Sequence, residues 1–265
     1  MAVAKLEKNG AIATITITRP DTLNALGQVG DGDVISGLCG VINADRAIKV
    51  AILTGEGRAF SAGGDVKAMK ERSGAFAGSP AEIRESYRGN IHKIIKALWN
   101  LEVPLISAVN GPAIGLGCDV ACMGDIRIAS ETAKFGVTFL KLGLIPGDGG
   151  AWLTPRIIGW SRACELLFTG EVIDAETARE WGFVTRVVSP EALMDEARSI
   201  AQKIANQPVH ALRVTKALMR QGQSAQFETI MELSAASQGL MHHTSDHAEG
   251  VAAVLEKRTP CFTGQ

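Results

Sequence analysis

Apolar residues alternate with threonine from Ala11 to Thr18, which is the period-two pattern of a strand with one buried face. Arg19 and Pro20 end this pattern. Two short apolar runs, Lys49 to Thr54 and Val103 to Val109, are each followed by a glycine or by Asn-Gly. Such runs are typical of strands that are covered on both faces, so we expect them to lie inside a sheet.

A helical period replaces the strand pattern between and after these runs. From Pro80 to Leu101, apolar side chains recur every three or four residues, which predicts one amphipathic helix with Ser79 as its cap. Beyond about Pro190 the pattern is helical throughout. Strands that alternate with helices predict an α/β core with right-handed crossovers over residues 1–190. Residues 191–265 are predicted to form a helical region for packing and oligomerisation.

Composition narrows the class of partner. Hydrophobic residues make up 46% of the chain and charged residues 21%, as in ordinary globular proteins. The 27 Lys and Arg are balanced by 28 Asp and Glu, so no positive excess favours nucleic acid or an anionic membrane. Five scattered cysteines and the lack of an apolar leader in the first ten residues predict a cytoplasmic protein.

One pattern occurs twice: a strand, a glycine, a loop, and then a close pair of glycines before an aspartate. The first copy ends in Ala62-Gly63-Gly64-Asp65 and the second in Gly115-Leu116-Gly117-Cys118-Asp119. Glycines after a strand leave backbone N–H groups open to a ligand, and two such donors aimed at one oxygen form an oxyanion hole. Asp119 would share a helical face with Leu116. The alternative is that these glycines only permit close packing and that Asp119 stabilises a helix N-terminus.

Several segments, taken in order, resemble the successive motifs of the enoyl-CoA hydratase/isomerase, or crotonase, family. They are Arg58 to Asp65, Ala108 to Asp119, Asp125 to Ser130 and Gly143 to Gly150, with similar first and last landmarks at Arg19 to Leu26 and Leu255 to Phe262. The resemblance implies a spiral of repeated ββα units followed by C-terminal helices. It also implies coenzyme A thioester substrates, no separate cofactor, and assembly as a homotrimer or homohexamer.

The resemblance further implies roles for individual residues. The backbone N–H groups of Gly64 and Leu116 would hold the thioester oxygen. The adenine and pantetheine site would be lined by Ala62, Asp65 and Val66 on one wall and by Thr22 and Leu23 on the other. Lys257 matches a lysine that can reach the nucleotide phosphate, sometimes from a neighbouring subunit; the alternative is a solvated lysine at a helix end.

The acid and base positions depart from the pattern of the family's hydratases, which use two glutamates. Asp119 stands at the first position and Phe139, which cannot carry a proton, at the second. Asp148 is the expected substitute, although flanking glycines also suit a plain turn residue. We therefore expect an enzyme that hydrates an enoyl-CoA or moves its double bond. Cleavage of a β-diketone and acyl-CoA binding without turnover remain alternatives.

Several aromatic and histidine side chains are further candidates for a functional role. Phe139 and Trp152 are expected to wall the acyl pocket. His92, on the predicted helix, is either a base near the acyl group or a structural histidine. His242, His243 and His247 lie near Asp246, but no second ligand cluster or zinc motif accompanies them, so no metal site is predicted.

Overall fold

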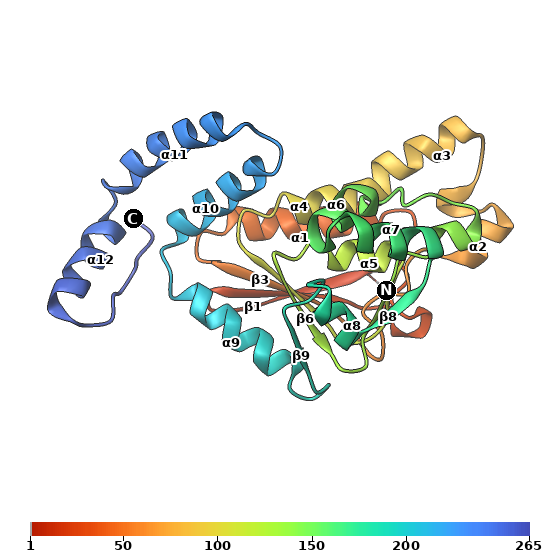
Figure 1. Ribbon diagram of the computed structural model, residues 1–265, viewed down its shortest axis with the longest axis horizontal. Coiled ribbons are helices and arrows are strands. Elements are labelled where there is room, and N and C mark those ends of the chain that lie inside the picture. The colour runs from red at the N-terminus through yellow and green to blue at the C-terminus, as the bar shows by residue number, and fades with distance from the viewer. Residues whose placement is uncertain (1) are drawn as a thin grey trace.

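The computed structural model describes residues 2–265, and its centre is a six-stranded sheet (Figure 1). The strand order is β1-β2-β3-β4-β6-β9, in which β1 is antiparallel to β2 and every other pair is parallel. The strands are β1 (Ala4–Asn9), β2 (Ile12–Ile17), β3 (Val50–Gly55), β4 (Leu105–Val109), β6 (Ile126–Ser130) and β9 (Arg186–Val188). The three strands predicted from sequence are thereby confirmed as β2, β3 and β4.

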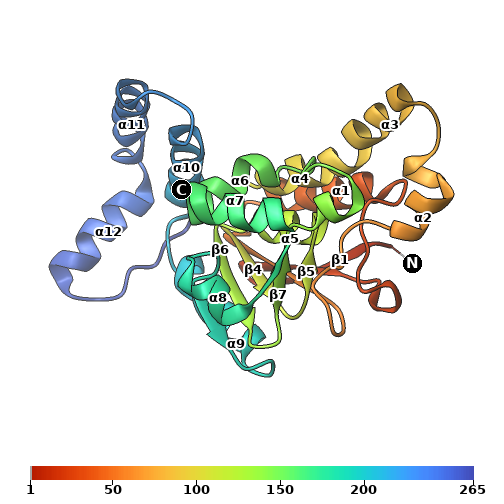
Figure 2. The same cartoon turned by 45° about the vertical axis from the view of Figure 1, so that its right-hand side comes forward.

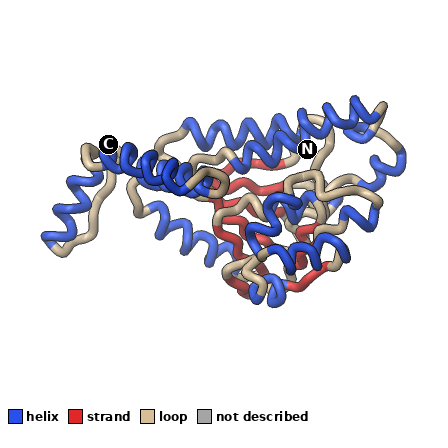
Figure 3. The backbone as a smooth tube through the Cα atoms, turned by 45° about the horizontal axis from the view of Figure 1, so that its top comes forward, coloured by secondary structure: helices blue, strands red, loops and turns tan. Residues whose placement is uncertain are grey.

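Burial along these strands follows the sequence pattern. In β2 the alternate residues Ala13, Ile15 and Ile17 are buried, whereas all of β4 is buried, as expected for a central parallel strand. Ala51 and Leu53 of β3 belong to a core under α1 (Asp31–Ala44), α4 (His92–Trp99) and α5 (Leu116–Ala121). Val50 and Ile52 pack on the opposite face with α9 (Leu193–Ala205). Figure 3 shows the strands in red between helices on either side.

A smaller sheet of order β5-β7-β8 carries the second glycine loop. Its strands are β5 (Ala113–Ile114), β7 (Lys134–Gly136) and β8 (Val172–Asp174). Gly115 follows β5 and donates its N–H to the carbonyl of Gly136 over 2.8 Å. The loop is thus fixed just before α5 begins. The remaining helices of the body are α2 (Val66–Glu71), α6 (Gly150–Ile158), α7 (Trp160–Thr169) and α8 (Ala175–Glu180), with short 3-10 turns at Pro20–Thr22, Gly74–Phe76 and Phe139–Leu142.

The predicted single helix from Pro80 to Leu101 is wrong in one respect, because a π-helical turn interrupts it. The segment consists of α3 (Pro80–Ser86), the π turn (Tyr87–Ile91) and α4. Ser79 caps α3 through a complete capping box with Glu82, as predicted for the helix start. The wider turn resets the helical register, and π turns of this kind are frequent at functional sites.

The last three helices form an arm beside the body, seen in blue in Figures 1 and 2. They are α10 (Val209–Gly222), α11 (Phe227–Met241) and α12 (Ser245–Glu256). In α11 no residue is buried, and Phe227 and Leu240 are more than two-thirds exposed. The preceding helix α9, although it lies beyond residue 190, covers the sheet. Among residues 2–265, no helix is long and apolar enough to cross a membrane.

Candidate active site at two interlocked glycine loops

The two glycine-rich loops pack directly against each other. A Cβ added at Gly117 would lie 2.1 Å from the carbonyl oxygen of Ser61, which no real side chain could tolerate. A Cβ added at Gly63 would lie 2.4 Å from the carbonyl oxygen of Ile114 and 3.3 Å from the nitrogen of Leu116. The glycines therefore allow a backbone-to-backbone approach that any other residue would prevent.

Two backbone donors are left open where these loops meet. Within residues 2–265, no acceptor is found for the N–H of Gly64 or for that of Leu116. Leu116 is the first residue of α5, so its N–H has no partner in the preceding turn. Gly115 before it has φ +54 and ψ −122, a conformation that glycine adopts without steric cost. The loops thus hold, within residues 2–265, two N–H groups without an acceptor.

The residues expected to contact coenzyme A lie next to these donors. The N–H of Ala62 donates to the carbonyl of Leu23 over 2.8 Å, so the two expected walls are joined. Thr22 and Val66 are exposed at the surface. Asp65 caps α2 by accepting a hydrogen bond from the backbone N–H of residue 68 over 3.0 Å, so its side chain already has a structural role.

Asp119 is fully buried on α5, in the turn that follows Leu116. One of its carboxyl oxygens, Oδ2, accepts the N–H of Gly150 at 3.1 Å, while Oδ1 has no partner among the residues that the structure describes. Burial raises the pKa of Asp119 well above its usual range, and the nearby groups Cys122 and Asp148 raise it further. Burial therefore favours the protonated form of this carboxyl.

Asp148 is the second buried carboxyl of the site. It is 3% exposed, and its Oδ1 has no hydrogen-bond partner in the described part of the chain. Burial raises the pKa of Asp148 to about 7. Asp148 and Asp119 lie close enough for the charge of one to affect the pKa of the other. The site therefore contains two buried carboxyls with raised pKa values, and the pKa of Asp148 lies near neutral pH.

Two side chains from the π turn and α4 flank Asp148. The Asp148 charge contributes to the raised pKa of Tyr87, and the rings of Tyr87 and His92 contact edge to face with centroids 6.0 Å apart. His92 Nε2 lies 2.9 Å from the carbonyl oxygen of Gly147. The hydrophobic pattern from Pro80 to Leu101 does not single out Tyr87, because the π turn that aligns it with His92 leaves no signal in that pattern.

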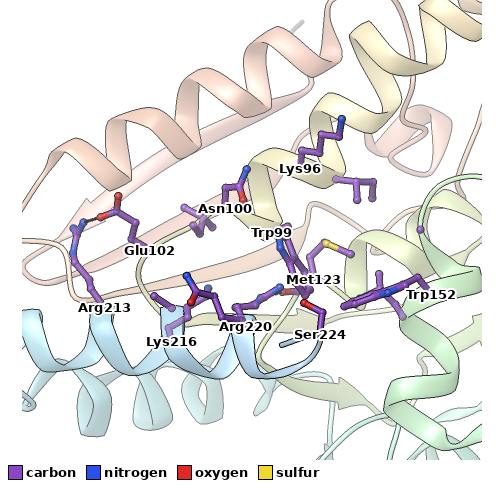
Figure 4. Close-up of a pocket in the computed structure, with 16 residues that line it drawn as sticks. Lys96, Trp99, Asn100, Glu102, Met123, Trp152, Arg213, Lys216, Arg220 and Ser224 are labelled. Atoms are coloured by element: carbon purple, nitrogen blue, oxygen red, sulfur yellow. Dashed lines mark hydrogen bonds and ion pairs between the residues drawn. The ribbon is translucent and has the colours of Figure 1, made fainter. Parts of the chain in front are cut away.

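Phe139 and Trp152 lie in different surroundings. The ring of Phe139 is 3.8 Å from the position of a Cβ added at Gly115, so it lies beside the second glycine loop. Trp152 instead contacts Trp99 edge to face, at 5.3 Å between ring centroids. It lines a cavity of about 670 Å³ between α4 and α10, which Figure 4 shows. Phe139, Asp119 and Asp148 do not line that cavity.

Lys257, His242 and His247 lie on the arm. Lys257 caps the end of α12 and is exposed. In Figure 1, α12 and α2 lie at opposite ends of the molecule, so Lys257 is remote from the glycine loops of its own chain. His242 Nδ1 and His247 Nε2 are 3.0 Å apart. Within residues 2–265, no group of three or more His, Cys, Asp or Glu is placed to hold a metal ion.

The fold is a ββα spiral in which two glycine loops pack against each other and carry two N–H groups that have no acceptor within residues 2–265. Residues 7–265 match the family model described as enoyl-CoA hydratase/isomerase. The chain is 37% identical to the 1,2-epoxyphenylacetyl-CoA isomerase of Escherichia coli, over 96% of this chain and 95% of that one.

Two further relatives support the same assignment. The chain is 37% identical to the crotonyl-CoA hydratase of Syntrophomonas wolfei, over 97% of this chain and 96% of that one. An enoyl-CoA hydratase structure from Bacillus anthracis superposes with a TM-score of 0.92 at 32% identity, covering 99% of this chain and 100% of that one. The chain therefore belongs to the enoyl-CoA hydratase/isomerase family, and it is an enzyme of the lyase or isomerase type found there.

Proposed function

We propose that the N–H groups of Gly64 and Leu116 bind the carbonyl oxygen of an acyl-CoA thioester and stabilise the enolate formed from it. The observation that carries this proposal is the pair of unpaired donors on two loops that glycine holds in contact. Negative charge develops on the thioester oxygen as a proton leaves the α-carbon, so fixed donors stabilise the transition state more than the substrate. Each donor of this type is worth about 3 kcal/mol.

Asp119 and Asp148 are the proposed proton carriers. Because burial favours the protonated form of Asp119 and Asp148 can ionise near pH 7, the pair can take a proton at one carbon and deliver one at another. Phe139 has no proton to exchange. Of the two reactions typical of the family, we favour movement of a double bond along the acyl chain, with hydration or dehydration of an enoyl-CoA as the second candidate.

The same proposal extends to the oligomeric state, the cofactor requirement and the cellular location. Because α11 buries no side chain, a neighbouring copy that covers it would remove apolar surface from water, which supports a homotrimer or homohexamer. Lys257 would then serve the coenzyme A site of a neighbour. We also propose that the reaction uses no separate cofactor and that the protein is cytoplasmic. A boundary at residue 190 would separate the site-bearing core from the helical region for packing and oligomerisation.

Two substrates distinguish the candidate reactions. The protein is incubated with a 3-enoyl-CoA and with crotonyl-CoA while the absorbance of the conjugated thioester is followed. We expect absorbance to rise with the 3-enoyl-CoA, as isomerisation creates the conjugated bond. Loss of absorbance with crotonyl-CoA alone would instead indicate hydration. Tight binding of coenzyme A thioesters without change in either assay would contradict catalysis, and release of carboxylate from a β-diketone thioester would indicate C–C cleavage.

A further inference from the structure

The loop that carries Asp148 is held from α4 by a single side-chain hydrogen bond. His92 Nε2 lies 2.9 Å from the carbonyl oxygen of Gly147, the residue just before Asp148. A carbonyl oxygen can only accept, so Nε2 must carry the proton and His92 is the donor. The ring is half-buried, and no other side-chain hydrogen bond to Gly147 is found in residues 2–265.

A second contact from the same helix supports the loop on its other side. A Cβ added at Gly149 would lie 3.6 Å from Ile95, so α4 packs against the loop just beyond Asp148. His92 is the first residue of α4, directly after the π turn. The π turn brings Tyr87 and His92, five residues apart, into ring contact. The helix register that places His92 against Gly147 therefore depends on this turn.

We propose that His92 is a positioning residue, which fixes the Gly147 carbonyl and thereby holds the Asp148 carboxyl buried and oriented toward the substrate. This inference rests on the proposed function of Asp148, but its first consequence is structural and does not require turnover. The ionisable groups around Asp148 are Asp119 on α5, Tyr87 on the π turn and His92 itself. Without the His92 bond the loop relaxes and water reaches the carboxyl. The pKa of Asp148 then falls toward that of an ordinary aspartate.

Tyr87 offers a direct readout, because it is the only tyrosine in the chain. Protein labelled with ¹³C at tyrosine Cζ gives one resonance, which the nearby Asp148 charge shifts as it titrates. The wild-type resonance is expected to titrate with a midpoint near pH 7, and the Asp148→Asn variant assigns that titration by abolishing it. This measurement reports the environment of Asp148 whether or not the enzyme turns over any substrate.

Two polar variants at position 92 distinguish loss of the hydrogen bond from loss of the imidazole ring. Glutamine extends an amide N–H to the position of Nε2, whereas the shorter asparagine does not. We expect His92→Asn to move the Tyr87 midpoint down by at least one pH unit and to lower kcat by ~10²-fold with little change in KM, because small misplacements of a catalytic group are costly. His92→Gln should restore both. His243→Asn, at an exposed histidine on the arm, is the matched control and should change neither.

The outcomes decide between positioning and other roles. A Tyr87 midpoint that is the same in His92→Asn as in the wild type would overturn the proposal. Equal losses in His92→Asn and His92→Gln would also overturn it, because the imidazole itself would then be required. If the midpoint shifts as expected while no acyl-CoA is turned over by the wild type, the positioning role stands and the proposed function of the site fails.

Discussion

Gly150 donates its backbone N–H to Oδ2 of Asp119 over 3.1 Å, and a Cβ at position 150 would lie 2.5 Å from Oδ1 of the same carboxyl. The first residue of α6 therefore both binds one oxygen of Asp119 and leaves room for the other. Within residues 2–265, this buried carboxyl therefore has one hydrogen-bonded oxygen and one without a partner. This arrangement also makes position 150 sensitive to the addition of a single methyl group.

Replacing Gly150 by alanine is expected to displace the Asp119 carboxyl and to lower kcat by ~10²-fold, because the added methyl would overlap Oδ1. Steady-state kinetics with whichever of the two test thioesters, a 3-enoyl-CoA or crotonyl-CoA, the wild type converts provides the measurement. Gly40→Ala is the matched control, since Gly40 is exposed on α1 and its added Cβ meets no atom within 4 Å. Normal activity in Gly150→Ala would show that the Asp119 carboxyl is not needed in this position.

Asparagine at position 119 or 148 removes the exchangeable proton while keeping nearly the same shape. We expect each of Asp119→Asn and Asp148→Asn to lower kcat by ~10²-fold or more, with smaller effects on thioester binding. Turnover is compared with the affinity of each variant for a non-reactive acyl-CoA. An Asp148→Asn variant with wild-type turnover would make Asp148 a turn residue, which is the alternative that the flanking glycines leave open.

The pH dependence of kcat/KM should report the ionisation of Asp148. Because burial raises the pKa of Asp148 to about 7, its basic form accumulates only above that pH. If Asp148 removes the α-proton, kcat/KM rises as the pH increases through about 7 and then levels off. Asp148→Asn should lose this rise. A wild-type rate that instead falls through pH 7 would assign Asp148 the role of acid.

The same raised pKa makes an independent prediction about stability. Between about pH 4 and pH 7 the folded protein keeps the Asp148 proton that the unfolded chain releases, so the free energy of unfolding falls as the pH rises. The loss is roughly 4 kcal/mol and is complete above about pH 7. Relative to wild type, Asp148→Asn should therefore gain up to that amount between pH 4 and pH 8. Urea unfolding at both pH values checks this, and parallel curves for the two proteins would contradict it.

The strands and the glycine loops were predictable because their signals are local. A strand buried on one face alternates and a strand buried on both faces does not, so β2, β3 and β4 follow from the sequence alone. The loops of Gly64 and Leu116 stand out because the same strand, glycine and aspartate pattern occurs twice along the chain. What the sequence does not reveal is that the two loops interlock, which depends on the distance between Gly117 and the Ser61 carbonyl.

The environment of Asp148 could not be predicted for a different reason. Its burial and raised pKa depend on contacts with α4 and the π turn, about 55 residues earlier in the chain. An amphipathic pattern of three and four residues does not reveal a π turn, so Pro80 to Leu101 was predicted as one helix. The contact of the Trp152 ring with Trp99 is likewise absent from the sequence pattern, because it joins α4 and α6.

The central claim is that two backbone N–H groups bind one thioester oxygen, and infrared spectroscopy tests it most directly. The stretching frequency of a ¹³C-labelled thioester carbonyl is measured for crotonyl-CoA free and bound to the protein. We predict a lower frequency in the complex, because hydrogen bonds weaken the C=O bond. Gly117→Ala, which would force the loops apart at Ser61, should abolish most of this shift, whereas Asp148→Asn should retain it. A bound carbonyl with the frequency of the free thioester would contradict the account.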